Sequence, residues 1–93
     1  MIKSFKDECA YNIYHGMRSL KFPIDMQNVC RRKLRMIDNA HQLNDLKIPP
    51  GNRLEALKGK LKDYYSIRIN DQWRLIFKWL RGDAYELEIV DYH

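Results

Sequence analysis

Two arginines lie at matching places on the two strands predicted within YYSIRINDQWRLIF, residues 64–77. Apolar side chains take the odd-numbered positions of both strands, and side chains alternate between the two faces of a strand. Both apolar sets reach one core face only if the loop has an odd number of residues, which Asn70–Asp71–Gln72 satisfies. Arg68 then lies opposite Arg74, on the face of the sheet that points away from the core.

Two guanidinium groups side by side repel each other unless an anion lies between them. Like charges directly across a sheet destabilise it by up to about 1 kcal/mol. The planar guanidinium fork binds a phosphate through two parallel hydrogen bonds. The pair of Arg68 and Arg74 therefore indicates a phosphate-binding site, and an accidental pairing of two surface arginines is the alternative.

The excess positive charge is confined to the same part of the chain. The whole sequence has a net charge of +5, and residues 52–81 alone hold eight basic and three acidic residues. Basic residues interleaved with aromatic ones are typical of surfaces that bind polyanions, although a lysine-rich solvated face fits the charge equally well. The basic residues are Arg53, Lys58, Lys60, Lys62, Arg68, Arg74, Lys78 and Arg81, and the aromatic ones are Tyr64, Tyr65, Trp73 and Trp79.

Two helices are predicted ahead of these strands. The first covers residues 6–14, and the second follows Pro23 over residues 24–40, with Asp25 as its N-cap. One face of the second helix is apolar. The opposite face is basic and could bind nucleic acid, while a solvated face or a contact with a partner protein is the alternative. The apolar residues are Met26, Val29, Cys30, Leu34, Ile37 and Ala40, and the basic ones are Arg31, Arg32 and Arg35.

Strands are predicted on both sides of the helices. A short strand at residues 2–5 precedes them, and a helical turn at residues 43–46 and the break PPGN follow them. The remaining predicted strands cover residues 54–57, 64–69, 73–80 and 84–91. This order predicts an α+β fold, with a small antiparallel sheet packed against two N-terminal helices in one domain over residues 1–93.

The requirement for an odd number of loop residues also applies to the hairpin between the last two strands. A three-residue loop, Arg81–Gly82–Asp83, places the apolar residues of both strands on the core face. It also sets Lys78 opposite Glu86 as a complementary pair on the outer face. The other pairs that it predicts are Trp79 with Tyr85, Phe77 with Leu87, Leu75 with Ile89 and Arg74 with Val90.

The sequence has no feature of a membrane-spanning or metal-binding protein. It lacks the run of about 18–20 apolar residues that a membrane span needs, and its charged N-terminus is unlike a signal peptide, so we expect a cytoplasmic protein. Cys9 and Cys30, taken with His15 and His41, match no metal-ligand spacing. We therefore expect two reduced, partly buried thiols, two surface histidines, and no metal or other cofactor.

Three segments resemble one known family. GNRLEALKG, SIRINDQWR and the C-terminal VDYH have the spacing of HigB-type toxins of the RelE superfamily, in its HigB/GraT branch, and the resemblance covers nearly the whole chain. The resemblance implies a RelE-like fold and the toxin of a type II toxin–antitoxin pair. Such a toxin cleaves mRNA in the A site of the 30S subunit on translating ribosomes without a metal. The partner implied is a HigA-like helix-turn-helix antitoxin.

The resemblance also assigns roles to residues. Glu55 or Lys58 would take the proton of the RNA 2′-OH, the arginines would hold the charge on phosphorus, and His93 would protonate the leaving oxygen. Tyr92 would stack on a base or donate its hydroxyl. The expected catalytic residues are Glu55, Lys58, Arg68, Arg74, Tyr92 and His93, and the expected RNA- or ribosome-binding residues are Arg53, Lys60, Lys62, Trp73 and Asp91.

Two other functions are compatible with the same fold. One is a ParE-like toxin that inhibits DNA gyrase, and the other is an RNA-binding module without catalysis. The paired arginines and the Glu55-x-x-Lys58 spacing favour the nuclease, because gyrase inhibition needs no phosphate cradle. Affinity for RNA without cleavage on ribosomes would identify the binding module.

Overall fold

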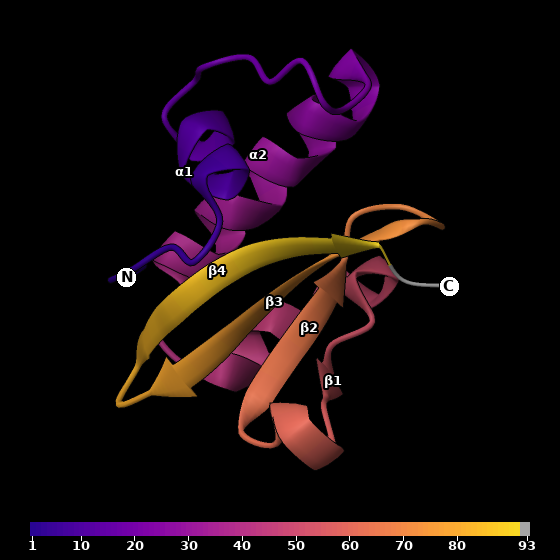
Figure 1. Ribbon diagram of the computed structural model, residues 1–93. Coiled ribbons are helices and arrows are strands. Elements are labelled where there is room, and N and C mark those ends of the chain that lie inside the picture. Colours follow the sequence, from indigo (N-terminus) through magenta and orange to yellow (C-terminus); the bar gives the residue numbers. More distant parts are fainter. Residues whose placement is uncertain (92–93) are drawn as a thin grey trace.

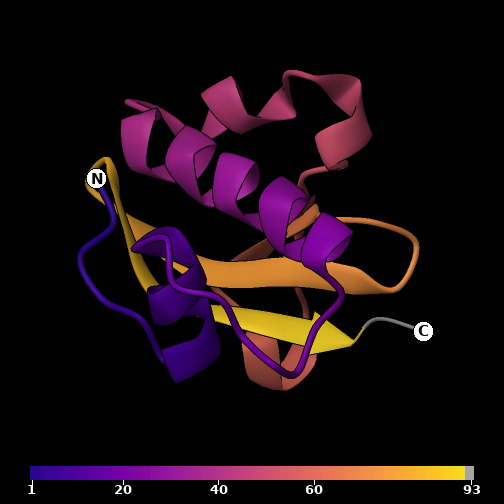
Figure 2. The ribbon, with the colours of Figure 1, turned by 90° about the horizontal axis from the view of Figure 1, so that it is seen from above.

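Two helices lie on one face of a four-stranded antiparallel sheet in the computed structural model, which describes residues 1–91 (Figures 1 and 2). The helices are α1 (Glu8–Tyr14) and α2 (Ile24–Asn39), and the strands are β1 (Glu55–Ala56), β2 (Tyr64–Arg68), β3 (Trp73–Leu80) and β4 (Asp83–Asp91). Short 3-10 turns are η1 (Leu43–Lys47), η2 (Pro50–Asn52) and η3 (Gly59–Leu61). The predicted α+β fold is confirmed. Two predicted catalytic residues, Tyr92 and His93, lie outside the described residues.

Figure 2 shows α2 lying over one face of the sheet, and the core lies between these two layers. The apolar stripe predicted on the second helix is buried, except for Val29, which is partly buried. It packs against odd-numbered residues of β2 and β3, which confirms the face assigned from the alternation. The buried residues of the two layers are Met26, Cys30, Leu34, Ile37 and Ala40 on the helix side, and Ile67, Ile69, Leu75 and Phe77 on the sheet side.

The N-terminal segment lies beside β4 instead of forming a full strand. Ile2 and Phe5 make isolated parallel bridges to Ala84 and Leu87. Asp7 then joins both layers, because its Oδ1 accepts a hydrogen bond from the Cys9 amide at 2.8 Å and caps α1. Its Oδ2 accepts from the Ile89 amide of β4 at 3.1 Å. One aspartate therefore starts the first helix and fixes it to the last strand.

The predicted N-cap of α2 is wrong. Pro23 is in the N-cap position, and the Gln27 amide donates to the Pro23 carbonyl at 3.1 Å to close the first turn. Asp25 lies inside that first turn, where its negative charge complements the positive end of the helix dipole. The Gln27 side chain is buried and holds the preceding loop, because it donates to the Ser19 and Phe22 carbonyls at 2.8 and 2.6 Å.

The first hairpin has the predicted register. Arg68 pairs with Arg74 and Ile67 with Leu75, so the three-residue loop is confirmed. The Asn70 Oδ1 closes that loop, because it accepts hydrogen bonds from the Gln72 and Trp73 amides, both at 2.9 Å.

The second hairpin differs from its prediction near the turn. The loop has two residues, Arg81 and Gly82, both with positive φ (52° and 82°), and Trp79 pairs with Ala84. Such a turn matches the twist of the strands but puts the strands one residue out of phase. A β-bulge corrects the phase at Glu86, whose φ is 58°.

The bulge divides the predicted pairs of this hairpin into two groups. Beyond it, Leu75 pairs with Ile89 and Arg74 with Val90, as expected. Before it, Lys78 pairs with Tyr85 and Trp79 with Ala84, so the pairs predicted for Lys78 and Trp79 are wrong. The charge complementarity survives, because the Lys78 Nζ lies 3.5 Å from the Glu86 Oε2.

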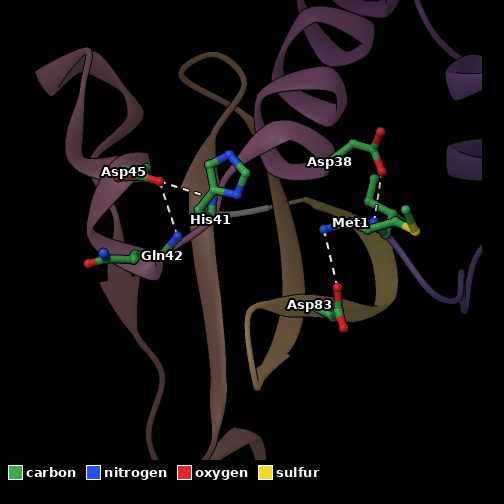
Figure 3. Close-up of polar contacts among 7 residues, drawn as sticks. Met1, Asp38, His41, Gln42, Asp45 and Asp83 are labelled. Carbon is green, nitrogen blue, oxygen red and sulfur yellow. Dashed lines mark hydrogen bonds and ion pairs between the residues drawn. The ribbon is translucent and has the colours of Figure 1, made fainter.

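Polar contacts close the chain around the end of α2 (Figure 3). The Asp45 Oδ2 accepts from the His41 and Gln42 amides, both at 3.0 Å, and starts η1. Those hydrogen bonds, from Gln42 and then His41, lower the pKa of Asp45 below its usual value of 3.8. Nearby, the Met1 ammonium lies 3.3 Å from the Asp83 Oδ1.

Both cysteines are free thiols, as predicted. Cys9 is partly exposed and Cys30 is buried, and burial raises the pKa of the Cys30 thiol from 9.0 to about 12. His15 and His41 are exposed. Over residues 1–91, no helix has the length and apolar character needed to cross a membrane.

Candidate active site

The paired arginines line a cavity of about 320 Å³ at the turn end of the β2–β3 hairpin. Three segments supply its walls: the residue after η2, the end of β2 with its loop, and the start of β3. The lining residues are Arg53, Arg68, Asn70, Asp71 and Arg74. Three arginines therefore line one small space, as expected of a site for a polyanion.

Arg74 is more deeply buried than the register alone suggested. Its side chain is only 6% exposed, although it lies on the face away from the core. Its Nη1 lies 2.9 Å from the Glu55 Oε1, and its Nη2 donates to the Arg53 carbonyl oxygen at 2.6 Å. Ser66 and Ile76, which are on the same face, are also buried, so the centre of this face is not the solvated surface that alternation implied.

Arg68 has a carboxylate partner of a different kind. Its Nη2 forms an ion pair with the Asp71 carboxylate, in the hairpin loop three residues later. The Arg68 side chain is 35% exposed and that of Asp71 is 99% exposed, so solvent screens this pair strongly. Each arginine of the predicted pair thus contacts its own carboxylate, which offsets the like-charge repulsion without a bound anion.

Arg53 supplies a backbone contact and a third guanidinium. Its backbone is in the left-handed region, with φ 47° and ψ 56°, which is uncommon for an arginine. That conformation presents the Arg53 carbonyl to Arg74, and Arg53 is one of the residues that line the cavity. Within residues 1–91, the Arg53 side chain makes no ion pair.

The candidate bases lie at the edge of the sheet. Glu55 begins β1, pairs with Ser66 in the register, and is half exposed beside Arg74. Lys58 is exposed at the N-cap of η3 and does not line the cavity, and the same is true of the exposed Lys60 and Lys62 around that turn. The structure therefore brings Glu55 to the arginines and leaves the three lysines on the surface next to the site.

The last strand ends beside the same hairpin, as Figure 1 shows. Asp91 pairs with Trp73, and its Oδ2 accepts a hydrogen bond from the Gln72 Nε2 at 3.2 Å. Trp73 itself packs edge-to-face on Phe22, with ring centroids 5.0 Å apart, so much of its ring belongs to the core.

Four residues at or next to the site were not predicted from the sequence. Asn70 and Asp71 line the cavity, and Asn52, which directly precedes Arg53, accepts a hydrogen bond from the Lys33 Nζ at 2.6 Å. Burial lowers the pKa of Lys33, and the charges of Arg32 and Arg68 lower it further. Asparagines in breaks such as PPGN are typical turn residues, and Lys33 follows Arg32 on a basic helix face, so no sequence signal separates them from ordinary residues.

A metal site is not formed by the part of the chain that the structure describes. Within residues 1–91, no three His, Cys, Asp or Glu side chains come together in a way that could hold a metal ion. Positive charge at the cavity comes instead from the guanidinium groups.

Two helices on one face of a four-stranded antiparallel sheet form the RelE-like fold. A mutant of YafQ from E. coli shows the same fold, with a TM-score of 0.67 at 15% sequence identity, over 98% of this chain and 91% of that chain. An identity this low supports the fold alone.

The chain belongs to the HigB-like toxin family, the RelE-like toxins HigB of type II toxin–antitoxin systems, whose family model matches residues 3–93. It is 45% identical over 85 residues to Toxin HigB-1 of Vibrio cholerae serotype O1, covering 90% of each chain. It is also 33% identical over 97 aligned positions to Endoribonuclease HigB of Proteus vulgaris, covering 100% of both. The chain is therefore the toxin of a type II pair, and an antitoxin is its partner.

Proposed function

We propose that this toxin is a ribosome-dependent mRNA endoribonuclease that cuts mRNA in the A site and arrests translation in the cytoplasm. The observation that carries the proposal is the convergence of Arg53, Arg68 and Arg74 on one cavity. The activity in the name of the Proteus relative supports RNA as the substrate.

The arginines would stabilise the charge that develops on phosphorus. Guanidinium groups bind carboxylates and phosphates through the same paired hydrogen bonds, so a scissile phosphate can replace Glu55 at Arg74 and Asp71 at Arg68. Arg53 carries a guanidinium that needs no such exchange. Positioned cations of this kind stabilise a transition state more than the ground state, which is what accelerates a reaction.

The base would be Glu55 or Lys58. Glu55 is the carboxylate that contacts the buried Arg74, and its displacement from Arg74 by the phosphate would free it beside the RNA 2′-OH. Lys58 lies three residues along the same edge and is open to solvent. The 2′-oxygen would attack phosphorus, the bond from phosphorus to the 5′-oxygen would break, and the products would carry a 2′,3′-cyclic phosphate and a 5′-hydroxyl.

The acid would come from the C-terminal tail. Asp91 lies beside the hairpin that carries the cavity, and the C-terminal tail continues from this residue. The His93 imidazole would protonate the leaving 5′-oxygen, since histidine changes charge near neutral pH. Tyr92 would stack on a base or donate its hydroxyl.

The ribosome would supply the orientation that the toxin lacks. The cavity is small for an RNA strand, and the neighbouring groups that we propose to contact RNA or ribosome are spread over an open surface. Holding two reactants in a fixed geometry lowers a barrier by several kcal/mol, so mRNA fixed in the A site should be cut far faster than free mRNA. The proposed contact residues are Arg53, Lys60, Lys62, Trp73 and Asp91.

We propose a HigA-like helix-turn-helix protein as the antitoxin, bound to the basic face of α2 or along the N-terminal segment. Arg31 is engaged in the fold, because its Nε donates to the Ile13 carbonyl at 2.8 Å. Arg32 and Arg35 are exposed and available to acidic residues. An antitoxin at either place would block ribosome entry by its bulk and leave the cavity uncovered.

Single-turnover cleavage on programmed ribosomes tests the function. The expected products are a 2′,3′-cyclic or 3′-phosphate and a 5′-hydroxyl, with unchanged rates after metal chelation that leaves the ribosome intact. A 2′-deoxy residue at the cut site should stop cleavage. Arg18→Ala, an exposed arginine after α1, is the matched control and should cleave normally. Normal cleavage of the deoxy substrate would refute attack by the 2′-OH, and with it the roles of base and acid.

A further inference from the structure

A buried amide directly precedes one of the arginines of the site in the chain. Asn52 is fully buried at the end of η2, and its side chain is saturated with contacts. Its Oδ1 accepts from the Lys33 Nζ of α2 at 2.6 Å, and its Nδ2 donates to the Leu46 carbonyl of η1 at 3.1 Å. Weaker contacts reach the Ile48 carbonyl and the Met36 sulfur. The Asn52 side chain thus joins α2, η1 and η2 at one point.

Arg53, the next residue in the chain, connects the anchored Asn52 to the active site. Arg53 has the left-handed backbone conformation that turns its carbonyl toward the Arg74 guanidinium. A left-handed arginine is strained compared with glycine, so the surrounding contacts must hold it. The anchored Asn52 side chain is the contact immediately before it. Arg74 is therefore held from one side by Glu55 and from the other by a carbonyl whose position depends on Asn52.

The lysine in this arrangement is not explained by stability. Lys33 is partly buried next to Arg32 and in the field of Arg68, and all three effects oppose its charge. A partly buried cation among cations costs stability that an apolar residue would avoid. Its observed contact is with the Asn52 Oδ1, which fixes the orientation of the amide and so directs the Nδ2 group to the Leu46 carbonyl.

We propose that Asn52, oriented by Lys33, is a positioning residue of the active site that acts through the Arg53 carbonyl on Arg74. The proposal deepens the function proposed above and rests on it for its kinetic test. Without Asn52, the Arg53 carbonyl would move and Arg74 would lose the hydrogen bond that its Nη2 donates to this carbonyl. A displacement of about 1 Å in a catalytic group can cost up to about 10²-fold in rate.

A double-mutant cycle separates positioning from general loss of stability. Asn52→Ala should lower the single-turnover rate by about 10- to 100-fold with ribosome binding nearly unchanged. In an Arg74→Ala background the same change should cost less than about twofold, because the group it positions is gone. Gln27→Ala is the matched control, since Gln27 is also a buried amide and holds three backbone groups of Ser19 and Phe22, neither of which lines the cavity.

Lys33→Met provides the second variant, because Lys33 is less buried than Asn52 and its replacement is better tolerated. Lys33→Met should lower the single-turnover rate by several-fold in the parent chain and have no effect in the Arg74→Ala background. Equal losses in both backgrounds would overturn the proposal. So would a loss in Gln27→Ala that matches Asn52→Ala at equal stability.

A spectroscopic readout keeps this result distinct from failure of the proposed function. In the parent protein the Arg74 Nη groups are held at both ends, so their NMR signals should be separate and slow to exchange with water. Asn52→Ala should merge them, while Gln27→Ala should leave them separate. If the parent chain cleaves no RNA, the proposed function fails and the Arg74 signals still decide the positioning. Unchanged Arg74 signals in Asn52→Ala would refute it.

Discussion

Arg74→Ala is expected to destabilise the protein far more than Arg68→Ala, although the two residues are directly opposite each other across the sheet. The register alone predicts that removing either arginine relieves like-charge repulsion and spares the fold. The environment of the two side chains changes that expectation for Arg74. Its side chain is 6% exposed and contacts Glu55 and the Arg53 carbonyl among residues 1–91, whereas the Arg68 side chain is 35% exposed and pairs with a carboxylate in solvent.

The size of the difference follows from the contacts of Arg74. A hydrogen bond to a charged group contributes about 1.5–3 kcal/mol, and Arg74 makes one to the Glu55 carboxylate and one to the Arg53 carbonyl. Glu55 is 48% exposed and regains water when its partner is removed, which reduces the loss. We expect a loss of about 3 kcal/mol for Arg74→Ala. Arg68→Ala removes a solvent-screened pair and should leave the free energy of unfolding nearly unchanged.

Thermal unfolding of the purified variants measures this difference. In a domain of this size about 1 kcal/mol shifts the midpoint by roughly 4–8 °C, so Arg74→Ala should unfold about 15 °C lower than the parent chain. Below both midpoints, each variant should lose about 10²–10³ in cleavage rate, because each loses one contact to the reacting phosphate. Equal unfolding midpoints for the two variants would refute the structural distinction. Full toxicity of either would refute the phosphate site.

Four further outcomes are expected. Removing residues 92–93 should lower single-turnover cleavage much more than ribosome binding, and equal losses would contradict a role in chemistry. Burial raises the pKa of Cys30 from 9.0 to about 12, so the buried neutral thiol contributes its full share of the unfolding free energy below pH 9.0. That share is lost as the pH rises toward 12, and Cys30→Ala should abolish this loss. Because backbone hydrogen bonds lower the pKa of Asp45, its contribution is present above pH 3.8 and disappears at lower pH, and the acid-unfolding curve of Asp45→Asn should lack it. Reversing the charge of Arg32 and Arg35 should weaken antitoxin binding without slowing cleavage, and antitoxin protection confined to the cavity would argue against this surface.

The residues that alternation could place were placed correctly, and the errors have local causes. The parity of two apolar strands determined the Arg68–Arg74 pair, because a shift by one residue would expose the whole core face. The same argument failed near the second turn, since a two-residue loop and a bulge at Glu86 together preserve the parity that one three-residue loop would give. The alternation of apolar residues predicts which pairs form beyond the bulge, but it does not distinguish a three-residue loop from a two-residue loop with a bulge.

The chemistry of the site was only partly visible in the sequence. Residue types and the family resemblance led to Glu55, Arg68 and Arg74, which the structure brings together. The pairing of each arginine with its own carboxylate depends on where the Arg53 carbonyl and the hairpin loop lie, and residue types do not predict those positions. Asn52 was not predicted for a similar reason, because its contacts join three segments that meet only in the folded chain.

The contact between Asp7 and β4 has a consequence for the order of synthesis. Asp7 and Ile89 are 82 positions apart, as are Ser4 and Glu86, whose Oγ and amide are also hydrogen-bonded. Contacts between distant positions form late and slow folding, so a growing chain has no strand on which to dock its first helix until β4 has been made. A ribosome that stops before β4 therefore leaves a fragment without the strand that borders Arg74, and that fragment cannot assemble the site.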